Sequence, residues 1–304
     1  MIVGVETRLA SHKLAFLGLL VAISIVWFWP YVLAVAEVAL RQEQYSHILL
    51  ILPLSACLAF MEAKQGICEG KAAPKAGLAL LAPAALLSWI GRGIAIPLSE
   101  STRLSLNILA LVLFWFAFVL LLFGTAAFRR FQWPLLVLLL LVPLPELVVS
   151  RLVFVFQVAS AKTTFWLFRL AGIPVTQHGL ILSLPMLDVE VAQQCSGIRS
   201  TMMLLVTSLT LCYLFLKPGW RRVLLLILVL PIAVLKNGVR IFVLATLGMY
   251  VDEAWLNGRL HHQGGVVFFM VGTAMVGFAI WVLRRFELGR RKQAGIWSLS
   301  RHVR

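Results

Sequence analysis

Residues 104–123, LSLNILALVLFWFAFVLLLF, contain no charged side chain. An α-helix of this length rises about 30 Å, which equals the thickness of the hydrocarbon core of a lipid bilayer. The stretch therefore predicts a transmembrane helix.

Similar apolar stretches recur along most of the 304 residues, of which 61% are hydrophobic and 13% are charged. A soluble domain has about 25% charged residues. We predict an all-α integral membrane protein with about eight transmembrane helices, forming a single polytopic domain over residues 1–304 with a core of about 14–285. The predicted spans are 14–36, 47–61, 76–92, 104–123, 133–149, 196–216, 223–247 and 262–283.

The formal net charge is +15, but the basic residues lie in short clusters between the apolar stretches. Because they form no single basic face, we expect no nucleic-acid partner. The positive-inside rule places both termini and the 217–222 turn in the cytoplasm, with alternate loops outside. We predict a basic cytoplasmic tail over residues 286–304. Its basic residues, together with the two arginines just before it, are able to hold anionic membrane lipid: Arg284, Arg285, Arg290, Arg291, Lys292, Arg301 and Arg304.

Two stretches depart from this pattern. Residues 144–172 follow Pro143 and Pro145 and carry several polar side chains, so they lie either at the outer interface or inside the helix bundle. Residues 173–194 contain glycine and proline, which favour turns, and apolar residues at alternate positions. This pattern predicts a short extracytoplasmic β-hairpin.

Polar residues surround Cys195 at the predicted start of a span, where a plain transmembrane helix is apolar. A cysteine at a helix N-terminus has a stabilised thiolate. The backbone N–H groups of Ser196 and Gly197 can face a developing oxyanion, since the first helical turn gives them no internal partner. Cys195 is thus a candidate nucleophile, and the alternative is a small packing residue.

Asn237 and Arg240 lie one helical turn apart within the next predicted span, whereas Lys236 points elsewhere. A charge at membrane depth is costly and generally faces a polar cavity or a partner. Arg240 is therefore a candidate site residue, and the alternative is that it extends to the outer interface.

His261 and His262 precede the last predicted span. A histidine can act as general acid or base toward a thiol. Adjacent histidines on a helix point about 100° apart and seldom bind one ion, so we expect no metal. With Cys195 and Arg240, a histidine at the same membrane face completes a set suited to nucleophilic catalysis.

At these residues the sequence resembles the exosortase and archaeosortase family. The matching motifs are CSGIRS with Cys195, NGVRI with Asn237 and Arg240, and HHQGGVVFF with His261. The resemblance implies a cysteine transpeptidase or protease without a cofactor in the bacterial inner membrane, with its active site facing the periplasm or outside. It further implies Cys195 as nucleophile, His261 as acid/base and Arg240 as oxyanion or orienting group, with His262 as the alternative to His261.

Partners implied by the resemblance are exported proteins whose C-terminal sorting signal combines a short motif such as Pro-Glu-Pro, a transmembrane helix and an Arg-rich tail. Such sorting is often linked to exopolysaccharide production. The alternatives are a transporter, with Arg240 and Lys236 along an anion path, and a non-catalytic assembly factor for polysaccharide export. The oligomeric state is left open by the sequence.

Overall fold

A computed structural model describes residues 2–64, 71–93, 97–217, 219–251 and 265–300. The chain forms two compact units, Met1–Val149 and Ser150–Arg304, which are described separately. Seven of the described helices are long and apolar enough to cross a membrane, and a bent helix pair makes an eighth crossing if it is counted as one. The prediction of an all-α membrane protein with about eight spans is confirmed.

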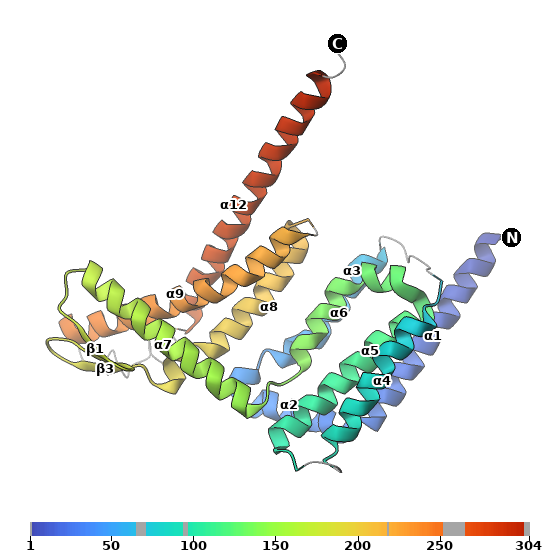
Figure 1. The fold of residues 1–304 in the computed structure, drawn as a ribbon, viewed down its shortest axis with the longest axis horizontal. Coiled ribbons are helices and arrows are strands. Elements are labelled where there is room, and N and C mark those ends of the chain that lie inside the picture. Colours follow the sequence, from blue (N-terminus) through green and yellow to red (C-terminus); the bar gives the residue numbers. More distant parts are fainter. Residues whose placement is uncertain (1, 65–70, 94–96, 218, 252–264, 301–304) are drawn as a thin grey trace. The chain divides into compact units, whose positions relative to one another are not determined.

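The first unit is helical throughout (Figure 1). Its elements are α1 (Ile2–Trp27), α2 (Trp29–Arg41), η1 (Glu43–Tyr45), α3 (Ile48–Lys64), α4 (Pro74–Gly91), α5 (Glu100–Arg130), α6 (Gln132–Leu138) and η2 (Leu139–Leu141). Helices α1, α4 and α5 lie side by side, and α3 packs on α6. The Ser99 side chain accepts a hydrogen bond from Thr102 N and caps the start of α5.

The predicted first span, 14–36, is not one straight helix. α1 and α2 meet at Phe28 at an angle of 77°. Pro30 stands in the first turn of α2, where its missing N–H removes a bond that would continue α1. The buried Phe28 ring packs near Phe114 on α5, with 5.9 Å between ring centroids, and this contact stabilises the bend.

Helix α5 is interrupted at Gly124, which has φ +77° and ψ −175°. Close to this break, the carbonyl of Leu120 accepts a hydrogen bond from Ala73 N at 3.1 Å. A Cβ on Gly124 would lie 1.9 Å from the Lys71 carbonyl oxygen. Only glycine allows both the backbone angle and the approach of the segment that precedes α4.

The prediction of a span over 133–149 is wrong as a continuous helix. The short α6 and η2 end before Pro143 and Pro145, and α7 (Glu146–Leu170) begins immediately afterwards. The Tyr45 hydroxyl donates to the Leu144 carbonyl at 2.9 Å and ties this break to the start of α3. Proline removes backbone donors and disfavours helix in the preceding residue, which explains the break.

The second unit contains most of α7 and then β1 (Thr176–His178), β2 (Ile181–Ser183), β3 (Asp188–Glu190), η3 (Gln193–Ser196), α8 (Ile198–Phe215), α9 (Trp220–Tyr250) and α12 (Gly265–Ser300). Buried residues of α7 recur with helical spacing along one face, at Val153, Gln157, Ser160, Thr164 and Phe168. One face of α7 therefore packs against the rest of its unit, and the helix is long and apolar enough to cross a membrane. Both alternatives for residues 144–172 stay predictions.

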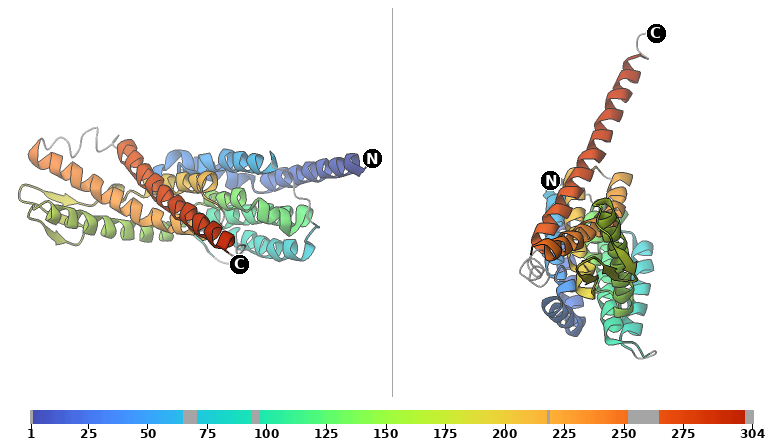
Figure 2. Two further views of the ribbon diagram at one scale, coloured as in Figure 1. Left: turned by 90° about the horizontal axis from the view of Figure 1, so that it is seen from above. Right: turned by 90° about the vertical axis from the view of Figure 1, so that its left-hand side faces the viewer.

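The predicted hairpin is confirmed and has a third strand. The three strands form an antiparallel sheet in the order β1-β2-β3, with Gln177 opposite Leu182 and Leu182 opposite Val189. Leu184, in the segment between β2 and β3, is buried with Phe168 of α7 and Ala245 of α9. The sheet accordingly lies beside the end of α7 and the second half of α9 (Figures 1 and 2).

Candidate active site

The cysteine lies in a tight turn at the start of a helix. Cys195 belongs to the 3₁₀ turn η3, and Gly197 is the N-cap of α8 with φ +72° and ψ 14°. This left-handed conformation is unfavourable for residues with a Cβ. The prediction that Cys195 stands at a helix N-terminus is confirmed for the backbone, whereas its side chain is outside the described part of the structure.

The carbonyl of Gly197 holds this turn to the first turn of α8. It accepts hydrogen bonds from Thr201 N at 2.9 Å, Thr201 Oγ1 at 2.8 Å and Ser200 Oγ at 3.0 Å. The Ser196 hydroxyl is 1% exposed and has no hydrogen-bond partner among the described residues. The turn is therefore fixed on its α8 side, and the buried Ser196 hydroxyl lies next to Cys195 in the chain.

Asn237 fixes the other side of the turn. Its side chain is 1% exposed, and Nδ2 donates to Ser160 Oγ of α7 at 3.0 Å. A Cβ on Gly197 would lie 2.7 Å from Asn237 Oδ1, so the amide is in close contact with the turn. One side chain thus connects α7, α9 and the segment that carries Cys195.

Gly238 allows α9 to approach α7 at the same level. Its carbonyl accepts a hydrogen bond from Thr164 Oγ1 at 3.2 Å. A Cβ on Gly238 would lie 2.6 Å from Thr163 Cγ2, so a larger residue would separate the helices. The Asn-Gly pair of NGVRI is explained by this close packing.

Helix α7 also holds the chain that leads into the cysteine turn. Gln157 Nε2 donates to the Val191 carbonyl at 2.8 Å. Val191 is fully buried against Ala161 of α7 and Ile241 of α9. Gln157 and Ser160 are not among the predicted site residues, although two polar residues three apart in an apolar helix indicate a shared polar face.

Lys236 is enclosed near the turn. Its side chain is 1% exposed, and Nζ donates to Ser200 Oγ of α8. A Cβ on Gly272 of α12 would lie 3.1 Å from Lys236 Cδ. Lys236 therefore joins α8, α9 and α12, on a different face from Asn237, as its position in the sequence predicts.

Arg240 follows Asn237 by one turn of α9 and is half-buried. The contacts of Lys236 with Ser200 and Gly272 bring the beginnings of α8 and α12 beside the second half of α9. Cys195 directly precedes α8, and His261 and His262 precede α12 in the sequence. Both histidines lie outside the described residues, so their roles stay predictions.

These features define a polytopic α-helical membrane protein in which α7, α8 and α9 hold the turn that contains Cys195. The sequence profile described as Transmembrane exosortase (Exosortase_EpsH) matches residues 35–278 of this chain. The protein belongs to the transmembrane exosortase family. Comparisons with curated proteins and with solved structures gave no match.

Proposed function

We propose that this protein is a membrane-embedded cysteine transpeptidase or protease that cleaves the C-terminal sorting signals of exported proteins. The observation that supports this most is the fixed turn behind Cys195, in which Gly197 is held between the first turn of α8 and Asn237. Catalysis requires a nucleophile held in the geometry of attack, and a turn secured on both sides meets that requirement.

In this proposal His261 accepts the proton of the Cys195 thiol, and the resulting thiolate attacks the carbonyl carbon of the scissile peptide bond. The negative charge of the tetrahedral intermediate is stabilised by Arg240 and by the N–H groups of Ser196 and Gly197. His261 transfers a proton to the leaving amine as the carbon–nitrogen bond breaks, which leaves a thioester on Cys195. An acceptor amine or a water molecule then attacks the thioester and regenerates the thiol.

The charge pattern of α8 supports an active site on the extracytoplasmic side. Helix α8 runs from the cysteine turn to Phe215, and Lys217, Arg221 and Arg222 follow at its far end. Basic loops are retained in the cytoplasm, so the cysteine end of α8 belongs to the outer face. A variant in which Cys195 is the sole cysteine should be labelled when a membrane-impermeant maleimide is added to intact spheroplasts. Labelling only after the membrane is permeabilised contradicts this orientation.

The decisive experiment is co-expression with an exported protein that ends in a Pro-Glu-Pro motif, a transmembrane helix and an Arg-rich tail. We expect processing by the unchanged enzyme and none by Cys195→Ala, with equal protein levels. A hydroxylamine-sensitive adduct at Cys195 should accumulate on the normal enzyme. Retained processing by Cys195→Ala contradicts the proposal.

His261→Ala and His262→Ala assign the acid/base in the same assay. We expect His261→Ala to abolish processing and His262→Ala to retain it. If only His262→Ala abolishes processing, His262 is the acid/base.

The enclosure of Lys236 favours an enzyme over a transporter. A residue along an anion path must be accessible to the ion, whereas Lys236 is 1% exposed and bonded to Ser200. A non-catalytic assembly factor would not use the Cys195 thiol, so in the same assay Cys195→Ser should process the substrate to the same extent as the unchanged protein.

A further inference from the structure

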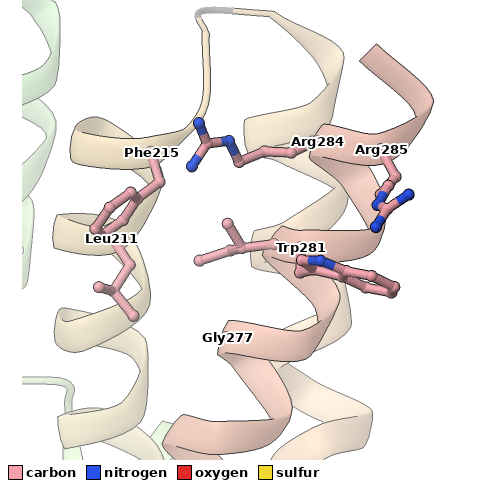
Figure 3. Close-up of a pocket in the computed structure, with 7 residues that line it drawn as sticks. Leu211, Phe215, Gly277, Trp281, Arg284 and Arg285 are labelled. Atoms are coloured by element: carbon pink, nitrogen blue, oxygen red, sulfur yellow. The ribbon is translucent and has the colours of Figure 1, made fainter. Parts of the chain in front are cut away.

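A cavity of about 380 Å³ opens between α8 and α12, away from the residues of the candidate active site (Figure 3). Its walls come from one side of each helix: Leu211, Phe215, Gly277, Ile280, Trp281, Arg284 and Arg285. Except for the two arginines and the indole N–H of Trp281, the lining is apolar. The cavity thus combines an apolar interior with a basic end.

The absence of a side chain on Gly277 leaves open space in the wall of the cavity. No atom lies within 4 Å of the position that a Cβ would take on Gly277, and the side chains of Leu211 and Phe215 stand across from it on α8. A narrow apolar slot between two transmembrane helices has the chemistry of a site for a hydrocarbon chain.

The basic end follows the apolar part of α12. Residues 266–283 contain no charged side chain, and Arg284 and Arg285 come directly after them, as basic residues do where a span meets the membrane surface. The Arg285 guanidinium lies 5.0 Å from the centre of the Trp281 ring, and Arg284 extends toward the end of α8 (Figure 3). Among the described side chains, no carboxylate pairs with either arginine.

We propose that this cavity binds an anionic phospholipid, with one acyl chain between α8 and α12 and the phosphate on Arg284 and Arg285. Arginine matches the geometry of a phosphate through two parallel N–H donors. A zwitterionic lipid has no net charge to balance two arginines.

Native mass spectrometry of the purified full-length protein tests the proposal, with phosphatidylglycerol and phosphatidylethanolamine of identical acyl chains as probes. Each basic residue near an anionic lipid strengthens binding by about fivefold, so Arg284→Gln/Arg285→Gln should lose roughly 25- to 30-fold in affinity for phosphatidylglycerol. Gly277→Leu keeps the charge but fills the slot, and should remove the tightly bound lipid.

Matched controls separate this site from general attraction to the membrane. Lys71→Gln/Lys75→Gln removes two positive charges from another part of the chain, and Gly18→Leu adds the same bulk at a position with equally open surroundings. Both should bind phosphatidylglycerol like the unchanged protein.

Equal binding of the two lipids, equal loss with Lys71→Gln/Lys75→Gln, or full retention by Gly277→Leu overturns the proposal. A dimer that Gly277→Leu disrupts, in place of bound lipid, also overturns it. Because lipid occupancy is measured without any substrate, failure here leaves the proposed catalytic function standing.

Discussion

Replacing Gly197 with alanine tests whether the left-handed turn behind Cys195 is required. Gly197 has φ +72°, and an L-residue with a Cβ loses about 1–2 kcal/mol in this region. That energy shifts the equilibrium away from the observed turn by about 5- to 30-fold. The added Cβ would also lie 2.7 Å from Asn237 Oδ1, so the Asn237 amide would have to move and weaken its bond to Ser160.

We expect Gly197→Ala to lower the initial rate of substrate cleavage at least about fivefold, and to change the rate at which Cys195 is alkylated. Gly179→Ala is the matched control. Gly179 has φ +65°, and a Cβ added there would meet no atom within 4 Å, so it carries the same backbone cost away from the cysteine turn. A normal rate with Gly197→Ala, or an equal loss with Gly179→Ala, would refute the reasoning.

Further predictions concern the residues that hold the helices together. Lys236→Met removes a charged donor to Ser200, a bond of about 1.5–3 kcal/mol, and should lower both the thermal midpoint in detergent and the cleavage rate; an unchanged midpoint contradicts this. Gln157→Leu leaves the buried Val191 carbonyl without its donor, at about 1–3 kcal/mol, and should slow cleavage more than Gln177→Leu on the exposed sheet edge. Gly124→Ala should prevent normal packing of α4 on α5 and lower the thermal midpoint in detergent, with Gly18→Ala as the unaffected control.

The apolar spans could be predicted from the sequence because a bilayer offers no partner for an exposed backbone. Each crossing segment must satisfy its own hydrogen bonds as a helix, so length and hydropathy alone indicate it. The bend at Phe28 and the break at Gly124 could not be predicted in this way. The bend combines Pro30, which the sequence shows, with the contact between Phe28 and Phe114, and the break depends on the approach of the Lys71 carbonyl to Gly124.

The candidate site could be predicted only in part. Cys195, Asn237 and Arg240 stand out because each is polar within an apolar segment, which is a property of the sequence itself. Gln157 and Ser160 do not stand out, because the sequence of residues 144–172 fits more than one placement. Their role follows from the burial of one face of α7 against α9 and the sheet.

Composition and charge by themselves determined that this chain is a membrane protein. They also determined the approximate number of spans and which polar residues interrupt the spans. Those properties depend on local transfer of side chains and backbone from water to lipid. The tertiary structure alone decided which polar residues meet. Asn237 reaches Ser160 and Gly197, and Lys236 reaches Ser200, because glycines at 197, 238 and 272 let distant helices approach to contact distance, and such approaches have no signature in any one segment.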